Sequence, residues 1–369
     1  MKAKEFSEEF CSYNSWKGLS YLPNFEAVKK RKFLPPIEAS IDPIHQCQLN
    51  CRFCNASRYL DSSYKMKMRR MPDDHLMRLI KFLSRWGVKS SCFGGGGEPT
   101  LHTGLPKALW LSKTLDMQSS VATNGVSFSD ELIDAMANYC RWVGVSIDSA
   151  TAKIYCYEKG ADKFKQVLSN IEKLNRRIRQ LGVNNDVAFK FLIAPWNQKE
   201  IFKACKIAKD LGVSDFHCRP MNFDHQGMSV AKRMLVKYDI DLILEQFKKC
   251  HKLATKDFRV FTVMHKYDKK FRPKKNFRQC YAAPICIQIT ADGSIWFCPD
   301  TRFNEFYKLG EHYPNPEKIL EFWGGEKHKK LVFETGKKHC TSRCTFGPFC
   351  EQAERLVINE DDPMCKFFT

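Results

Sequence analysis

Short apolar strands alternate with amphipathic helices across residues 37–220, and this alternation is the feature that most constrains the fold. Strands that alternate with helices form a parallel sheet covered by those helices. About six strand–helix steps fit into the span, whereas eight close a TIM barrel. We therefore expect an α/β fold with an open, partial (β/α)6 TIM-like barrel. The predicted strands are 37–41, 90–93, 120–123, 142–147, 187–193 and 215–219, and the predicted helices are 72–86, 105–115, 130–138, 164–181, 199–211 and 240–253.

The composition of the chain predicts three parts. Residues 1–36 are expected to form an irregular, partly basic lead-in that closes with a Pro-Pro pair. Residues 37–262 contain the expected barrel. Residues 263–369 begin with a basic, Pro-containing linker at 266–279 and continue with seven cysteines and little periodic pattern. Such a segment has too little core to fold alone, so we expect bound metal to stabilise it.

Hydrophobic residues make up 43% of the 369 residues and charged residues 27%, which is typical of a folded protein. The first ten residues lack the apolar core of a signal peptide, and no apolar stretch reaches the 18 residues or so that span a membrane. We therefore expect a cytoplasmic protein with no membrane partner.

The chain has 17 cysteines, an odd number. Disulfide-rich proteins are usually short and secreted, and we expect neither property here. In a reducing compartment, clustered cysteines more often bind metal or carry out redox chemistry. The cysteines therefore favour a metal-binding protein over a disulfide scaffold.

The formal net charge is +19, from 60 basic and 41 acidic residues. Basic runs occur at 29–32, 65–70, 266–275 and 327–330. A basic field of this size suits an acidic partner, an anionic substrate or nucleic acid, because it attracts negative charge. A solvated basic surface without a partner explains the charge equally well.

Three cysteines follow the first predicted strand. Cys47, Cys51 and Cys54 lie within eight residues, and Phe53 precedes the last of them. One loop can therefore supply three thiolates to a [4Fe–4S] cluster, which leaves one iron open to a ligand. The loop also follows the carboxyl end of a strand, the functional side of such sheets. A zinc site is the less favoured alternative.

A glycine run follows the second predicted strand, in the order Gly94-Gly95-Gly96-Gly97-Glu98-Pro99. Backbone without side chains allows a ligand to approach closely. By itself, such a run also fits a flexible loop or a phosphate-binding loop.

Together the two motifs resemble the signature of the radical S-adenosylmethionine (SAM) family, which has CxxxCxxC with an aromatic residue where Phe53 stands and a GGEP motif matched by residues 96–99. The resemblance implies that the three cysteines hold a [4Fe–4S] cluster, that SAM chelates the open iron, and that residues 96–99 hold the SAM amino group. An electron from a donor such as flavodoxin or ferredoxin would then cleave SAM to a 5′-deoxyadenosyl radical, which abstracts hydrogen from the substrate. The resemblance covers roughly residues 37–369.

Polar residues at the ends of later predicted strands match the family less specifically. The resemblance implies that they contact SAM, and the lysine and arginine among them suit a carboxylate or a phosphate. Barrel enzymes build their sites from such strand ends, although an Asn-Gly pair also fits an ordinary turn. The candidate SAM-binding residues here are Thr123, Asn124, Ser146, Asp148, Lys190 and Arg219, and His217 shares a strand face with Arg219.

The C-terminal cysteines resemble the SPASM extension found in part of the family, which carries two auxiliary [4Fe–4S] clusters. The match departs from the pattern twice, because CxxxC replaces CxxC and Glu354 stands where another cysteine is usual. A single auxiliary cluster or a zinc-binding tail are the alternatives. The resemblance implies one cluster on Cys340, Cys344, Cys350 and Cys365, and a second on Cys280, Cys286 and Cys298 with its fourth ligand open.

Three functions follow from these patterns. The leading hypothesis is a radical enzyme that crosslinks, oxidises or epimerises a peptide or protein side chain, because the SPASM extension is common in peptide-maturing members. The second is a radical enzyme that acts on an anionic small molecule, such as a sugar phosphate, nucleotide or cofactor precursor, which suits Lys190, Arg219 and the net charge. The third is a non-catalytic metal protein that binds nucleic acid, which explains the charge but not the glycine run.

Overall fold

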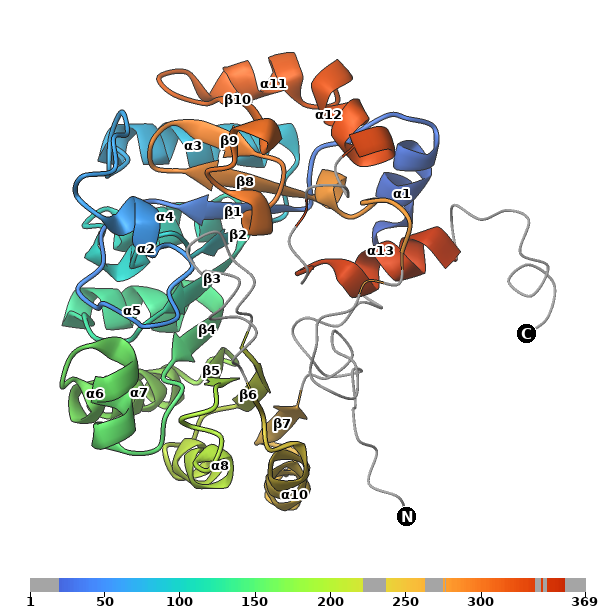
Figure 1. Cartoon of the computed structure of the whole chain (residues 1–369). Coiled ribbons are helices and arrows are strands. Elements are labelled where there is room, and N and C mark those ends of the chain that lie inside the picture. The colour runs from blue at the N-terminus through green and yellow to red at the C-terminus, as the bar shows by residue number, and fades with distance from the viewer. Residues whose placement is uncertain are drawn as a thin grey trace.

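The computed structural model describes residues 20–221, 237–262, 275, 277–335, 340 and 344–355. Its strands are β1 Glu38–Asp42, β2 Ser90–Phe93, β3 Gln118–Thr123, β4 Cys140–Ser146, β5 Asp186–Ile193, β6 Asp215–Pro220, β7 Arg259–Thr262, β8 Cys286–Thr290, β9 Ser294–Trp296 and β10 Lys308–Glu311. They form one sheet in the order β10-β9-β8-β1-β2-β3-β4-β5-β6-β7 (Figure 1). Strands β1 to β8 pair in parallel, and β9 and β10 are antiparallel. Because β10 and β7 are the edges of this order, the described sheet is an open, partial barrel, as predicted.

Helices between the strands cover the outer face of the curved sheet (Figure 1). They form where the sequence has helical spacing: in α7, Val167, Ile171 and Leu174 are fully buried. Among the described helices, none is long and apolar enough to cross a membrane. The helices are α1 Leu22–Lys29, α2 Ser57–Leu60, α3 Asp73–Trp86, α4 Leu105–Thr114, α5 Asp130–Tyr139, α6 Ala152–Lys159, α7 Phe164–Leu181, α8 Ile201–Asp210, α10 Ile240–His251, α11 Ile319–Phe322, α12 Glu326–Lys330 and α13 Gly347–Ala353.

The expectation of an irregular lead-in is wrong for residues 22–29, which form α1. Phe25 and Val28 of this helix are buried in the main core. The helix has only eight residues and a proline in its first turn, so its sequence shows no sustained periodicity.

The C-terminal segment contributes to the barrel itself. Strand β8 pairs in parallel with β1, from Cys286 opposite Glu38 to Thr290 opposite Asp42. All five residues of β8 are buried, and a strand buried on both faces shows no alternating pattern in its sequence. The expectation of too little core is therefore wrong for residues 286–311, which share the core of the barrel. Most of the expected linker lies outside the described residues.

The two faces of the sheet differ in chemistry. Alternate strand residues point to opposite faces, and Ala39, Ile41 and Phe93 are fully buried on the helix side. The inner face is polar and mostly half-buried, so solvent or a ligand reaches it. Its polar residues include Glu38, Ser40, Cys92, Ser120, Ser146, Lys190, His217 and Arg219.

A pair of buried histidines joins α3 to the segment after β10. His75 Nε2 and His312 Nδ1 are 2.9 Å apart, and His312 Nε2 is 3.0 Å from the Thr290 carbonyl oxygen. Both side chains are fully buried. Burial lowers the pKa of each histidine to about 4.

We expect the free energy of unfolding to fall as the pH drops from 6.5 to 4. An unfolded histidine gains its proton near pH 6.5, whereas these two resist protonation down to about pH 4, so the unfolded state binds more protons in this window. At pH 5, one such histidine lowers stability by roughly 2 kcal/mol relative to neutral pH. Denaturant unfolding at pH 7 and pH 5 measures the loss. A His312→Gln variant should lose less between the two pH values, and an unchanged loss would contradict this account.

Candidate functional site

The cysteine loop runs from β1 to α2 and contacts the carboxyl end of α6. The Asn50 amide donates to the Lys159 carbonyl at 3.1 Å, and the Arg52 amide donates to the Glu158 carbonyl at 2.9 Å. The Arg52 side chain donates to the Tyr157 carbonyl at 2.9 Å and lies over the Tyr157 ring. The last carbonyls of a helix have no partner within the helix, so the loop satisfies them. These contacts fix the loop backbone through the protein alone.

The three thiols of this loop, Cys47, Cys51 and Cys54, are partly buried. Burial, together with the charge of a second thiol of the set, raises the pKa of each thiol, and the pKa of Cys51 is raised to about 11. The thiols therefore lie within electrostatic reach of one another. The thiols would have to lose their protons to bind a metal. As these side chains lie in the described part of the chain, neither the three thiols nor any other group of three or more His, Cys, Asp or Glu side chains is placed to hold one metal ion.

The glycine loop after β2 packs directly against residues 42–46. A Cβ on Gly97 would lie 2.2 Å from the Ile44 carbonyl oxygen, and a Cβ on Gly95, whose φ is +123°, would lie 2.2 Å from the Asp42 carboxylate. The Gly96 amide donates to Asp42 Oδ2 at 3.0 Å. Glycine is therefore required here because the two segments of backbone touch. The packing places the glycine loop beside the segment that leads into Cys47.

Two of the predicted SAM-binding residues, Thr123 and Asn124, bond a third, Glu98, whose side chain is buried. Glu98 accepts hydrogen bonds from Thr123 Oγ1 at 2.5 Å, from the Asn124 amide at 2.7 Å and from Thr100 Oγ1 at 2.7 Å. Burial raises the pKa of this carboxyl. Asn124 Nδ2 also lies 3.7 Å from Cys47 Sγ. The glycine loop, the end of β3 and the cysteine loop thus form one connected site.

Asp148 lies in a second buried cluster, on the other side of the cysteine loop. Its carboxylate forms a buried ion pair with Lys159 and accepts the Leu192 amide at 2.7 Å. Lys159 Nζ lies over the Phe53 ring, 4.8 Å from its centroid. Phe53 therefore contacts a buried positive charge directly beside the cysteine loop.

Lys159 and its neighbour Glu158 were not predicted from the sequence. Glu158 accepts Trp196 Nε1 at 2.6 Å and Asn197 Nδ2 at 2.7 Å, while its Oε2 has no partner among the described residues. Burial, and then the charge of Asp148, raise the pKa of Glu158 to about 9. No spacing rule distinguishes Lys159 from the other members of the 60 basic residues, because its burial arises only when α6 packs against the loop.

Ser146 and Lys190 lie opposite each other on β4 and β5, and Lys190 lies opposite His217 on β6. All three are on the polar inner face. Burial, and then the charge of Arg219, lower the pKa of Lys190 to about 8. Two positive groups that destabilise each other favour an anion between them, so this face suits a carboxylate or a phosphate.

Five C-terminal cysteines interact electrostatically, namely Cys280, Cys298, Cys340, Cys344 and Cys350, although the described residues among them form no group placed to hold one metal ion. Burial, then Asp300 and three of these thiols, raise the pKa of Cys298. Burial, then hydrogen bonds with the thiols of Cys280 and Cys344, raise the pKa of Cys350. These thiols come from both of the predicted ligand sets, so the structure does not separate those sets as the sequence pattern did.

Cys286 begins strand β8 and faces Glu38 of β1. Its Sγ is 3.9 Å from Glu38 Oε1 on the inner face of the sheet. Burial, then the charges of Glu38 and Cys92, raise its pKa. Because Gln288 pairs with Trp296 in the antiparallel β8–β9 ladder, Cys286 and Cys298 lie at the same end of this strand pair.

Two further positions bear on the C-terminal cysteines. The Glu354 carboxylate, at the end of α13, accepts the Arg278 amide through both oxygens at 2.9 Å. Arg278 lies two residues before Cys280 in the sequence, so Glu354 is held close to the segment that contains Cys280. Cys365 lies outside the described residues.

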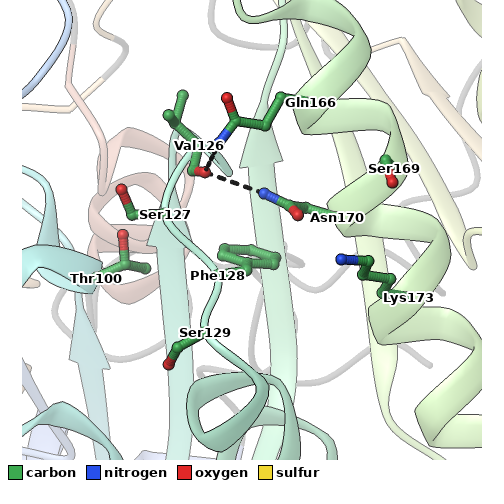
Figure 2. Close-up of a pocket in the computed structure, with 9 residues that line it drawn as sticks. All are labelled: Thr100, Val126, Ser127, Phe128, Ser129, Gln166, Ser169, Asn170 and Lys173. Carbon is green, nitrogen blue, oxygen red and sulfur yellow. Dashed lines mark hydrogen bonds between the residues drawn. The ribbon is translucent and has the colours of Figure 1, made fainter.

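A hollow of about 500 Å³ lies between the loop after β3 and α7. Figure 2 shows Gln166 and Asn170 of α7 donating to the Val126 carbonyl, at 2.9 and 3.0 Å. Thr100 in its wall bonds Glu98, and Ser127 accepts Gln48 Nε2 at 3.1 Å. The hollow therefore contacts both the glycine loop and the cysteine loop. Its remaining lining residues are Phe128, Ser129, Ser169 and Lys173.

The model of the radical SAM superfamily matches residues 41–190. An S-adenosylmethionine-dependent nucleotide dehydratase of Lacinutrix mariniflava is 32% identical over 28% of this chain and 21% of its own length. A probable GTP 3′,8-cyclase of Pyrococcus abyssi is 27% identical over 41% of this chain and 47% of its own length. This chain thus spans less than half the length of either curated relative.

Among solved structures, Streptococcus suis SuiB bound to S-adenosylmethionine superposes with a TM-score of 0.64 and 15% identity, covering 90% of this chain and 77% of that one. At this identity the likeness shows the fold, a partial barrel. The superfamily match runs from the end of β1 into β5 and includes both the cysteine loop and the glycine loop. The likeness to the radical SAM superfamily is therefore shown for residues 41–190, the part of the chain that contains both site motifs.

Proposed function

We propose that this chain cleaves SAM reductively and abstracts hydrogen from a substrate with the resulting 5′-deoxyadenosyl radical. The match of residues 41–190 to the radical SAM superfamily supports a [4Fe–4S] cluster and SAM. We assign the cluster to Cys47, Cys51 and Cys54. The observation that carries the assignment is the packing of the glycine loop onto residues 42–46, which brings Glu98 and the cysteine loop into one site.

The residues of the site have distinct roles in this proposal. When bound, the reduced cluster supplies the electron that breaks a carbon–sulfur bond of SAM, and flavodoxin or ferredoxin would deliver that electron. Glu98 is held by several donors, so its carboxylate is already positioned to accept the SAM ammonium group. Lys190 and Arg219 would attract the SAM carboxylate or an anionic substrate. The half-buried inner face limits the access of water to a reactive radical.

We further propose that residues 263–369 form a SPASM-like auxiliary domain. One cubane takes four thiolates, and the five cysteines that interact electrostatically are enough in number for one auxiliary cluster. Cys286 and Cys365 would then be needed only if a second cluster forms.

A peptide or protein side chain is our first candidate substrate. SuiB has also been solved bound to its precursor peptide SuiA, and that structure covers 90% of this chain with a TM-score of 0.61. The match includes the C-terminal segment as well as the barrel. Crosslinking, oxidation and epimerisation are the outcomes that hydrogen abstraction from such a side chain would allow.

An anionic small molecule is the second candidate, and a specific observation favours it. Lys190 and Arg219 lie on the inner face, where a substrate would meet the radical. The curated relatives are named for action on nucleotides. Sugar phosphates, nucleotides and cofactor precursors all carry the charge that these residues would bind. The net charge of +19 agrees with this class.

Formation of 5′-deoxyadenosine tests the central proposal. The protein, reconstituted with iron and sulfide without oxygen and given SAM and a strong reductant, should release 5′-deoxyadenosine, whereas a Cys47/Cys51/Cys54→Ala variant should release none. Cys156→Ala is the matched control because Cys156 is exposed and outside the site. No product from iron-loaded wild type would overturn the proposal.

A substrate panel in the same assay separates the two substrate classes. The correct substrate should raise the yield of 5′-deoxyadenosine, because it captures the radical that otherwise returns to SAM. Peptides encoded near the gene form one arm, and nucleotides and sugar phosphates form the other. Stimulation by peptides alone would exclude the anionic class, and stimulation by anionic metabolites alone would exclude the peptide class.

Gly97→Ala should weaken SAM binding by at least about tenfold, because the added methyl group would force the glycine loop away from residues 42–46. Equilibrium dialysis with labelled SAM measures the change. Gly182→Ala is the control for a glycine substitution away from the site, since Gly182 has open space around it. Equal SAM affinity in the two variants would contradict this role of the glycine loop.

A further inference from the structure

A turn after Cys298 connects the C-terminal cysteines to the glycine loop. Helix η5, Pro299–Thr301, begins this turn, and Cys298 Sγ accepts the Asp300 amide at 3.2 Å. The turn then presents three side chains, Asp300, Arg302 and Phe303, to different neighbours. Together these contacts link Cys298 to the glycine loop.

Asp300 holds the segment that carries Cys344. The Thr345 amide donates to Asp300 Oδ2 at 2.6 Å, and Thr345 Oγ1 donates to Asp300 Oδ1 at 2.9 Å. Both oxygens of one carboxylate therefore hold the residue next to Cys344. The turn is thus fixed to the C-terminal cysteines at two points, Cys298 and Cys344.

Arg302 forms a buried ion pair with Asp42 at the end of β1. Arg302 Nη1 lies 2.7 Å from Asp42 Oδ2, and the two side chains are 11% and 0% exposed. The same oxygen accepts the Gly96 amide at 3.0 Å. One oxygen atom therefore receives both the Arg302 side chain and the backbone of the glycine loop. A displacement of Arg302 must change the environment of the Gly96 amide.

Phe303 fixes the far side of the turn. Its ring stacks on Tyr59 with 3.9 Å between centroids and meets His45 edge-on at 5.1 Å. Tyr59 and His45 flank the cysteine loop on either side in sequence. The turn therefore contacts the segments before and after the three cysteines as well as the glycine loop.

Several buried polar atoms at and beside the ion pair have no hydrogen-bond partner in the described part of the chain. Among the described residues, Asp42 Oδ1, Arg302 Nε and both ring nitrogens of His45 are buried without a hydrogen-bond partner. Buried polar groups are normally paired, and leaving them unpaired is costly. The cost is understandable if the geometry at Asp42 matters for the site rather than for stability alone.

We propose that Arg302 is a positioning residue that couples the C-terminal cysteines to SAM binding through Asp42 and the Gly96 amide. Ordering of the C-terminal cysteines by a bound cluster fixes the turn, the turn fixes Arg302 and Asp42, and Asp42 fixes the glycine loop. Because such coupling is reciprocal, bound SAM also stabilises the metal-bound C-terminal segment. This inference rests on the proposed function of the glycine loop.

The test compares Arg302→Met with Arg302→Lys and with Arg259→Met. Arg259 is the matched control, because it forms ion pairs with Asp215 and Asp186 at the β6–β7 edge of the sheet, away from the glycine loop. Two quantities are measured on the iron-loaded proteins: the Kd for SAM, and the hydrogen exchange of the peptide that contains residues 94–97, without SAM.

We expect Arg302→Met to raise the Kd for SAM about tenfold or more and to speed amide exchange at residues 94–97. Arg302→Lys should keep most of both properties, and Arg259→Met should leave both unchanged. The same Kd and exchange rate in Arg302→Met as in Arg259→Met would overturn the inference. If the wild type itself fails to bind SAM, the proposed function fails, and the exchange rates still decide whether Arg302 positions the loop.

Arg302→Met leaves Asp42 as a lone buried charge, which destabilises the folded protein. The double variant Asp42→Asn with Arg302→Met removes both charges and keeps an acceptor for the Gly96 amide. It should fold and should still show weakened SAM binding and faster exchange. Wild-type values for both in the double variant would overturn the inference.

Discussion

The site depends on direct contact between two stretches of backbone, the glycine loop and residues 42–46. Side chains at positions 95 and 97 would occupy space that Asp42 and Ile44 already fill. A run of glycines increases the conformational entropy of the unfolded chain and so destabilises the fold. Hydrogen bonds from the Gly96 amide to Asp42 and from the Glu98 amide to the Gln46 carbonyl offset part of that cost. As a result, Glu98 is held at a fixed position close to the end of β1.

A cluster of buried charges supports the other side of the cysteine loop. Asp148 and Lys159 are both almost fully buried, and such charges are tolerated only as a pair with further hydrogen bonds. Because the pKa of Glu158 is raised to about 9, Glu158 is mostly protonated at neutral pH and adds little negative charge. The cysteine loop thus contacts a neutral ion pair at the end of α6. The positive end of that pair, Lys159, faces Phe53.

Much of the barrel could be predicted because its helices and strands carry their own periodic patterns. The bounds of β2 and α7 agree with the prediction residue for residue, and the two site motifs stand at strand ends as expected. The missed elements lack such patterns: β8 is buried on both faces, and α6 is short with buried charged residues. The burial of Lys159 depends on contacts between distant segments, and so does the contact of Cys286 with Glu38. Neither is visible in local spacing.

The pairing of β8 with β1 determines where the C-terminal cysteines lie relative to Cys47, Cys51 and Cys54. Cys47 follows the carboxyl end of β1, whereas Cys280 precedes the amino end of β8, and the two strands are parallel neighbours. The sets therefore lie toward opposite ends of the same strand pair. With five residues in β1 and about 3.3 Å per residue, the strand spans roughly 16 Å. A strand pair in the core holds this distance far more constant than a flexible linker would, so an auxiliary cluster would keep a fixed position relative to the cysteine loop.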